Sequence, residues 1–414
     1  MSGCPTCCVA TGSHCRYHKL VKTCLRRGSA PIAARKSLPS LGCIAPTGYS
    51  ENKNNEMKRL LATTLAALTV GTVSGFGSTV ASSEPGEPWL PPSPVPVREN
   101  SPAKIVYALG GARPPTFDWD YYTIRAGDEF FPDVNRKLID YPARAPFRYV
   151  PTFLVPGPRD EVTIGEAIAV ATKNLNQAIH RGTEPAAVVG LSQGSLALDT
   201  EQEQLATDPT APPPDQLTFN TFGDPSGYHG FGKSVLASIF RPGDYIPLID
   251  YTMPQRMDSQ YDSNRVVAAY DGLSEFPDRA DNLLAQLNCF AGGAISHTPS
   301  GFFNPEDVPP QNIRTTVNSR GAKTTTYLIP VNHLPLTLPL RYLGWSDALV
   351  DQIDAVLQPK IDAAYAYNDN PLNKPISVDP VNGMDPIAGI DAELRDSILN
   401  VFAQLRSILP PPPG

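Results

Sequence analysis

The sequence predicts an α/β fold with a mainly parallel central sheet and helices on both faces of that sheet. Two observations carry this prediction. Short apolar runs typical of strands alternate with stretches in which apolar residues recur at helical spacing. One of these runs, residues 187–191, passes through Gly190-Leu-Ser-Gln-Gly194 directly into a stretch that can form a helix.

The composition favours a large globular domain with appendages. The chain has 414 residues, of which 41% are hydrophobic, and its 45 prolines point to many rigid loops and linkers. The net charge of −7 is unevenly distributed, because residues 1–56 are basic and the rest of the chain is strongly acidic. Nucleic-acid binding needs a basic face, so we expect no nucleic-acid partner.

Residues 1–56 form a basic leader that holds six of the seven cysteines. A zinc knuckle is suggested by four residues of the leader, Cys4, Cys7, Cys15 and His18. However, the spacing to a second ligand pair is irregular, and there is little apolar content to fold around a metal. We therefore predict no metal site and no cofactor. We expect the leader to be disordered, or to be an extension upstream of a natural start at Met57.

Residues 57–83 predict export. Lys58 and Arg59 precede a mostly apolar stretch and a run of small residues, which is the order found in a secretory signal or an N-terminal membrane anchor. Cleavage after Ala81 and retention as an anchor both fit this pattern. Residues 84–100 are a proline-rich spacer, so the segments that follow are expected outside the membrane.

Residues 101–370 are predicted to form the α/β domain, and residues 371–414 a loop, a short amphipathic helix and a proline-rich end. The expected strands are apolar runs bounded by turn residues (104–109, 187–191, 217–222 and 266–270), and a further short apolar run covers 149–155. Apolar residues at helical spacing predict five helices, at 163–179, 195–206, 279–291, 346–357 and 390–409. The first of them begins with the capping box Thr163-x-x-Glu166. A hairpin is expected at 313–317 and 324–331.

Three segments carry more specific expectations. In the helix at 279–291 we expect Leu283, Leu284 and Leu287 to face inward, and in the helix at 346–357 one side should be apolar (Leu349, Ile353, Val356 and Leu357). Residues 231–257 are rich in large apolar side chains broken by proline and glycine. This insertion is interpreted either as a lid or wall for an acyl chain or as a buried cap subdomain.

Gly190-Leu-Ser-Gln-Gly194 has the form of a nucleophile elbow, a strand–turn–helix unit with a serine at its apex. The backbone at the apex is strained, and a Cβ at Gly190 or Gly194 would collide with the neighbouring strand or helix. Ser192 is therefore the predicted nucleophile. The unit indicates an α/β-hydrolase, in which the site lies beyond the carboxyl ends of the strands.

A serine nucleophile needs a base within hydrogen-bond reach and an acid that orients the base. In this architecture the expected chain order is serine, acid, histidine. Asp271 follows an apolar strand directly and is the preferred acid, with Asp224 as the alternative. Asp278 is interpreted instead as the N-cap of the helix at 279–291.

Four histidines in the body of the chain are candidates for the base. His180 precedes Ser192 and is expected at the surface, and His229 lies in a glycine-rich loop close to the Asp224 strand. His297 follows the helix after Asp271, and His333 follows the second strand of the hairpin. The pattern alone leaves His297 and His333 open.

Stabilising the oxyanion of an acyl-transfer intermediate requires two backbone N–H groups. Gln193, the residue after the nucleophile, is expected to supply one. The other is expected from the loop after the first strand, at Gly111 or Ala112.

Several stretches together resemble the mycobacterial PE-PPE domain, a family of serine α/β-hydrolases related to cutinases (190–195, 222–225, 270–277, 282–288, 334–336 and 339–344). The helical PE or PPE leader usual in that family is missing and a signal-anchor segment replaces it. This combination is similar to the membrane-anchored acyltransferases that complete trehalose glycolipids of the outer envelope. The resemblance implies acyl-ester chemistry and favours His297 over His333, although the aromatic residue expected close behind this histidine arrives late, at Phe302.

The resulting hypothesis is ping-pong acyl transfer. His297, oriented by Asp271, would deprotonate Ser192, and the acyl group taken from a lipid ester would pass to an acceptor hydroxyl. Two alternatives remain at this point. One is a carboxylester hydrolase with water as the acceptor, and the other is a non-catalytic envelope-binding protein on a hydrolase scaffold.

Overall fold

The computed structural model describes residues 102–113, 119–152, 157–255, 258–279, 281–331 and 333–366, and residues 403, 406 and 407 near the C-terminus. The basic leader, the export segment 57–83, the spacer and most of the tail lie outside these residues. Within the described part, no helix combines the length and the apolar content that a membrane crossing requires.

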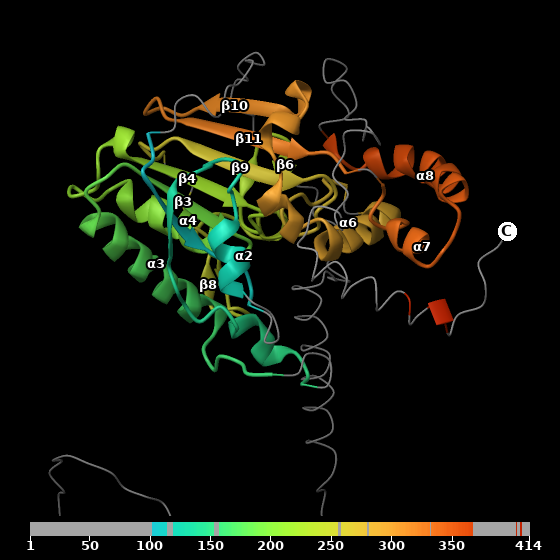
Figure 1. Ribbon diagram of the computed structural model, residues 1–414, viewed down its shortest axis with the longest axis horizontal. Coiled ribbons are helices and arrows are strands. Elements are labelled where there is room, and N and C mark those ends of the chain that lie inside the picture. Colours follow the sequence, from blue (N-terminus) through green and yellow to red (C-terminus); the bar gives the residue numbers. More distant parts are fainter. Residues whose placement is uncertain are drawn as a thin grey trace, which may run out of the picture. The chain divides into compact units, whose positions relative to one another are not determined.

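A seven-stranded sheet forms the centre of the domain, with the strand order β10-β11-β9-β4-β3-β1-β2 (Figure 1). Every neighbouring pair is parallel except the β10–β11 hairpin at one edge. The predicted α/β fold with a mainly parallel sheet is confirmed. The strands are β1 (Ile105–Leu109), β2 (Asn135–Leu138), β3 (Ala186–Leu191), β4 (Leu217–Phe222), β9 (Ser263–Ala268), β10 (Ile313–Val317) and β11 (Lys323–Ile329).

Helices cover both faces of the sheet because side chains alternate along each strand. On one face, strand residues pack with α3 (Ile164–Arg181) and α4 (Gln193–Leu205) in a core that includes Leu109 and Val188. On the other face, the core joins Val106 and Val189 to the segment after α2 (Trp119–Arg125), to α6 (Leu283–Ile295) and to α8 (Asp347–Asp362). Figure 1 shows α3 at the lower left, with α6, α8 and the short α7 (Leu338–Tyr342) at the right.

The capping box that starts α3 is present as predicted. The Thr163 side chain accepts a hydrogen bond from the Glu166 N–H, and the Glu166 carboxylate accepts one from the Thr163 N–H at 2.7 Å. Asp250 also accepts a hydrogen bond from the Thr163 hydroxyl. The start of this helix is thus tied to a segment almost ninety residues further along the chain.

One sheet strand was not expected. β2 pairs with β1 at the edge of the sheet, but its sequence, Asn-Arg-Lys-Leu, carries no apolar run. Edge strands can be short and polar because one side faces solvent. The apolar run at 149–155 does not supply the second strand: residues 145–149 form a 3₁₀ helix, and 153–156 lie outside the described residues.

The predicted inward faces of α6 and α8 are partly wrong. Leu283 and Leu287 are 66% and 46% exposed, and the buried side of α6 consists of small and polar residues (Ala285, Asn288, Cys289, Gly292 and Gly293). On α8, Val356 is exposed, whereas Val350 and Ile361 are buried. Periodicity identified the helices, but close packing against a backbone turn selected small residues for the α6 interface. The N-cap of α6 is Asn282 and not Asp278.

The predicted insertion, described over residues 231–255, is part of the crossover from β4 to β9. This crossover contains α5 (Val235–Ile239) and two short hairpins, β5–β6 (Tyr228–His229 and Gly232–Lys233) and β7–β8 (Tyr245–Ile246 and Tyr251–Thr252). Most of its large apolar side chains belong to the core shared with α3 and α4 (Val235, Leu236, Ile246, Ile249, Tyr251 and Met253). These side chains fill the core, as the cap-subdomain interpretation expects. Ile239, Tyr245 and Leu248 remain exposed.

Candidate active site

The carboxyl ends of the central strands meet at one edge of the sheet. Leu109 pairs with Gly190, Leu191 with Phe222, and Phe222 with Val266. The loops that follow β1, β3, β4 and β9 therefore begin side by side. These loops hold the predicted nucleophile, the predicted acid and the residues expected to form the oxyanion hole.

Ser192 occupies the turn between β3 and α4 and has φ 53° and ψ −119°. Non-glycine residues rarely adopt a positive φ, and such strain is typical of functional turns. The Ser192 N–H donates to the Phe222 carbonyl at 2.8 Å, which ties the strained turn to the end of β4. The side chain is partly exposed and thus open to a substrate.

The flanking glycines are required by close contacts, as predicted. A Cβ on Gly194 would lie 2.6 Å from the Leu109 carbonyl oxygen, and one on Gly190 would lie 2.9 Å from the Gly194 backbone. Gly111 approaches from β1: a Cβ there would lie 2.8 Å from the Ser192 Cβ. The elbow and the loop after β1 are therefore packed backbone against backbone.

Asp271 is fully buried, with an exposed fraction of 0%. Its Oδ1 accepts a hydrogen bond from the Leu273 N–H, and its Oδ2 accepts one from the Ser274 hydroxyl at 2.5 Å. Tyr270, just before it, has φ 62°, so the chain leaves β9 through a second strained turn. Gly292 of α6 lies against this turn, because a Cβ there would meet the Tyr270 carbonyl. Asp271 is thus held at one position by the turn and the helix.

His297 lies just beyond α6, and its Nδ1 is 2.7 Å from Asp271 Oδ2. A carboxylate can only accept a hydrogen bond, so Nδ1 carries the proton and Nε2 the lone pair. Nε2 is buried and has no hydrogen-bond partner within the described residues. The Ser300 hydroxyl donates to the His297 carbonyl at 2.6 Å and so holds the backbone of this residue.

Gly223 connects the histidine to the serine. It has φ 63°, and a Cβ on it would lie 2.7 Å from Cε1 and 2.9 Å from Nδ1 of His297. Since the Ser192 N–H binds the Phe222 carbonyl, Ser192 and the His297 ring both contact the Phe222–Gly223 peptide unit. In unliganded enzymes the serine–histidine hydrogen bond is often long, so this arrangement fits a general base near its nucleophile.

The candidate donors for an oxyanion lie on both sides of Ser192. Gln193 is the first residue of α4, so its N–H has no partner within the helix. Gly111 and Ala112 belong to the loop against the elbow, and the Tyr141 hydroxyl holds this loop by donating to the Gly110 carbonyl at 2.5 Å. The structure thus brings together the backbone segments that were expected to form the hole.

Asp224, the alternative acid, is engaged elsewhere. Its Oδ2 is 2.8 Å from Arg265 Nη1, and its Oδ1 accepts hydrogen bonds from the N–H and hydroxyl of Ser226. His229 is also engaged: Nε2 lies 2.9 Å from the Ser274 carbonyl, and Nδ1 accepts from the Phe231 N–H. Burial lowers the pKa of His229 to about 4, so this histidine is neutral at physiological pH.

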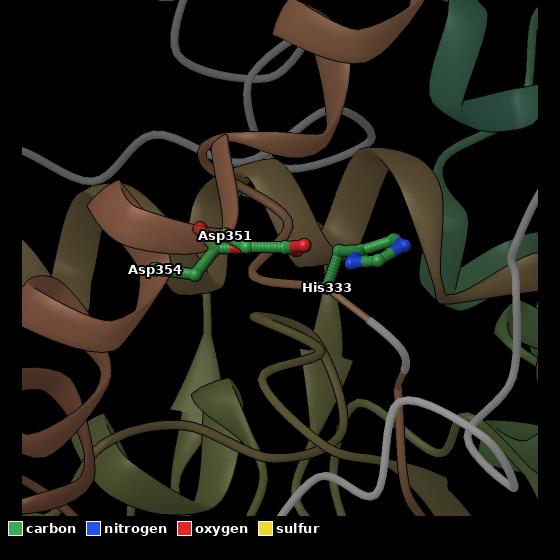
Figure 2. A group of neighbouring side chains, drawn as sticks. All are labelled: His333, Asp351 and Asp354. Carbon is green, nitrogen blue, oxygen red and sulfur yellow. The ribbon is translucent and has the colours of Figure 1, made fainter. Parts of the chain in front are cut away.

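The remaining two histidines lie beside other carboxylates. His180 contacts Asp208 at 3.3 Å, near the amino ends of the strands. Figure 2 shows His333 beside Asp351 and Asp354 of α8, with one ligand atom from each residue within 4.8 Å of the others. His297 is thus hydrogen-bonded to Asp271, whereas His333 lies in a separate cluster with Asp351 and Asp354.

The His333 cluster does not have the character of a metal site. Arg341 donates to Asp347 at 2.8 Å and to Asp351 at 2.5 Å, and it lies 3.7 Å from Asp354. A guanidinium therefore already supplies the positive charge that these carboxylates require. The Thr337 hydroxyl donates to Asp354 as well.

Two residues of the site were missed by the sequence reasoning. Gly223 was seen only as a turn residue, although a glycine directly after a strand at the carboxyl edge signals a close approach of another group. Ser274 was not singled out, although Ser and Asp three residues apart can hydrogen-bond within one turn. Neither contact with His297 or Asp271 follows from the local pattern alone.

A strained serine between strand and helix, set beside an aspartate–histidine pair at the carboxyl edge of a parallel sheet, defines a serine α/β-hydrolase-fold enzyme, an acyltransferase or an esterase. The model of one such family, described as the PE-PPE domain, matches residues 132–366. The chain belongs to the PE-PPE domain family.

Three relatives from Mycobacterium tuberculosis (strain ATCC 25618 / H37Rv) are named as acyltransferases or as an esterase. The chain is 63% identical to diacyltrehalose acyltransferase Chp2 over 338 residues, which cover 80% of this chain and 94% of the relative. It is 36% identical to SL1278 acyltransferase Chp1, over 82% of this chain and 77% of the relative. A match to esterase PE16 is 31% identical and covers 59% of this chain and 45% of that protein.

Proposed function

We propose that this enzyme transfers fatty acyl groups between lipid esters, with trehalose-based glycolipids as donor and acceptor, through an acyl-enzyme on Ser192. The observation that carries the proposal is the pairing of His297 with Asp271 over the peptide unit that holds Ser192. The choice of glycolipid is supported by the relative named for diacyltrehalose, which this chain matches over nearly its whole length.

In the first half-reaction, His297 Nε2 takes the proton of the Ser192 hydroxyl as Oγ attacks the ester carbonyl carbon. The negative charge on the carbonyl oxygen is stabilised by the N–H groups of Gln193 and of Gly111 or Ala112. When the intermediate collapses, the alcohol of the donor leaves with the proton from Nε2, and the acyl group stays on Ser192. Asp271 holds the ring and stabilises the imidazolium without taking the proton itself.

In the second half-reaction, a hydroxyl of the acceptor gives its proton to Nε2 and attacks the acyl carbon. Ser192 leaves and regains the proton, so the enzyme returns to its initial state. Hydrolysis is the second candidate function, because Ser192 is partly exposed and water can take the place of the acceptor. The match to an esterase of the same family supports this alternative.

The test is to incubate the purified full chain with diacyltrehalose and follow the products by mass spectrometry. We expect a more highly acylated trehalose together with the monoacyl product, and we expect neither from Ser192→Ala. Ser319→Ala, which removes a serine of the β10–β11 turn, is the matched control and should react as the wild type does. Free fatty acid and monoacyltrehalose, with no more highly acylated trehalose, would contradict the transferase and leave the esterase.

Export is part of the same proposal. We propose that residues 57–83 carry the chain out of the cytoplasm, as a cleaved signal or as a membrane anchor, so that the reaction takes place in the cell envelope. The support is the order of basic, apolar and small residues in that segment. Accessibility of the folded domain to protease added to intact cells, or its appearance in the medium, would test this; protection in intact cells would contradict it.

A further inference from the structure

We propose that Arg265, a largely buried arginine of β9, is a positioning residue for the catalytic side chains, because one guanidinium connects the two elements next to Ser192 and Asp271 with the turn against which the His297 ring lies. The inference rests on the proposed roles of Ser192, Asp271 and His297. It concerns side chains that do not touch the reacting atoms.

The guanidinium bridges two carboxylates. Arg265 Nη1 lies 2.8 Å from Asp224 Oδ2, and Nη2 lies 3.3 Å from Asp199 Oδ1. The Ser226 hydroxyl lies within hydrogen-bond distance of both carboxylates, 3.0 Å from Asp199 and 3.1 Å from Asp224. Asp224 and Asp199 are themselves mostly buried, so the four side chains form a closed polar group beneath the carboxyl edge of the sheet.

Each member of this group belongs to a segment that carries or contacts a catalytic residue. Asp224 follows Gly223, against which the His297 ring lies. Asp199 lies on α4, the helix that begins directly after Ser192. Arg265 lies on β9, the strand that leads to Asp271. A displacement within the group therefore changes the position of Ser192 relative to His297 and Asp271.

The fit of the group leaves little freedom. A Cβ on Gly227 would lie 2.3 Å from Asp224 Oδ2 and 2.7 Å from Arg265 Nη1, so the chain after Asp224 wraps tightly around the ion pair. The Gly223 N–H also donates to the Val266 carbonyl at 2.9 Å, next to Arg265 on β9. The turn below His297 is thus attached to β9 by both backbone and side chain.

The charges explain why an arginine is needed here. Two carboxylates share one guanidinium, and burial together with the charge of Asp224 raises the pKa of Asp199 to about 7. Without the guanidinium the two carboxylates would repel each other at this point. A buried ion pair contributes little net stability compared with apolar residues, but its planar fork fixes the distance and direction of both partners.

The effect on catalysis follows from geometry. A shift of about 1 Å between nucleophile and base can lower a rate by roughly 100-fold. A lysine at position 265 would keep the charge but could not hold both carboxylates in one plane. We therefore expect a graded loss of rate, larger for Arg265→Met than for Arg265→Lys.

The experiment measures the rate at which a fluorophosphonate labels Ser192 in the full chain, at a temperature where circular dichroism shows each variant to be folded. Labelling needs no lipid, so it is independent of the acyl donor and acceptor. We expect Arg265→Met to label about 10- to 100-fold more slowly than the wild type, and Arg265→Lys to fall between them. Arg341→Lys is the matched control, because Arg341 also bridges aspartates; it should lose thermal stability but label at the wild-type rate.

A double-mutant comparison separates positioning from general damage. If Arg265 acts through His297, Arg265→Met should slow labelling less than about twofold when His297→Ala is already present. An equal loss in both backgrounds, or wild-type labelling by Arg265→Met, would overturn the proposal. If Arg265→Met does not fold, Arg265→Lys serves in the same comparison. Wild-type labelling by His297→Ala alone would instead refute the proposed triad.

Discussion

At the residue scale, exposure decreases along the three catalytic candidates. Ser192 is partly exposed, His297 retains 6% exposure, and Asp271 retains none. A substrate can therefore reach the serine, while His297 Nε2 and the Asp271 carboxylate stay away from water. In such surroundings the carboxylate interacts more strongly with a developing imidazolium than it would in solvent.

The two candidate bases give a direct prediction. We expect His297→Ala to lower kcat by on the order of 10⁶-fold, because the residual rate then comes from the oxyanion hole and substrate binding alone. His333→Ala should stay within about threefold of the wild type, since His333 lies beside the carboxylates of α8. The rates of ester hydrolysis by the two variants, assayed in parallel, test both expectations. Loss of activity in His333→Ala alone would mean that His333, and not His297, is the base.

The sequence left these two histidines unresolved for a physical reason. Both follow an element that ends near the carboxyl edge, so periodicity and chain order fit either. The choice depends on the path of α6, which packs its glycines against the Tyr270–Asp271 turn and returns the chain to Asp271. That contact involves backbone atoms and leaves no apolar pattern to recognise.

At the element scale, α6 shows how far a helical pattern can be interpreted. Its leucines were expected in the core, yet the buried face is formed by small residues that allow the helix to approach a turn of the backbone. Leu284 alone among the three leucines packs against the core, and it is partly buried. Apolar spacing predicts that a helix exists more reliably than which of its faces is covered.

The exposed face of α6 gives a stability prediction. Leu283→Gln should change the free energy of unfolding by no more than about 0.5 kcal/mol, because the side chain is already in solvent. Leu284→Gln should cost about 1–2 kcal/mol, because part of an apolar contact is lost. Denaturant unfolding of the two variants makes the comparison; equal losses would mean that Leu283 is covered in the folded protein.

At the scale of the whole molecule, the fold could be predicted because two central strands, β1 and β3, are nearly continuous apolar runs. β1, β3 and β4 are buried almost along their full lengths, as expected for strands covered on both faces. β2 could not be predicted in this way, since only its backbone pairing with β1 defines it. The interior also holds polar groups whose positions depend on contacts between distant parts of the chain.

Glu201 is such a group, and it makes stability depend on pH. It is fully buried on α4, and among the described residues Oε1 has a partner, the Asn176 amide at 2.8 Å, whereas Oε2 has none. Burial raises the pKa of Glu201 to about 7, above its ordinary value of 4.5. The folded state therefore binds this proton more tightly than the unfolded state, and the contribution of Glu201 to stability falls as the pH rises from about 4.5 to about 7.

Replacing the Glu201 carboxyl by an amide should remove this loss of stability at higher pH. We expect Glu201→Gln to raise the free energy of unfolding at pH 8 by on the order of 2–3 kcal/mol, and to leave it nearly unchanged at pH 4.5. Glu161→Gln, at an exposed glutamate, is the control and should show no such dependence on pH. Unfolding curves at the two pH values measure the effect; an equal gain at both would mean that packing, and not ionisation, is responsible.

The positive φ of Ser192 has a consequence for how the chain tolerates substitution. A side chain held in this region of the backbone map costs about 1–3 kcal/mol, and glycine would relieve much of that cost. The most stable residue at the apex of the elbow is therefore one that has no hydroxyl. Selection for stability and selection for catalysis favour different residues at this position, so copies of the gene released from the need for activity are expected to drift toward glycine here while the fold persists.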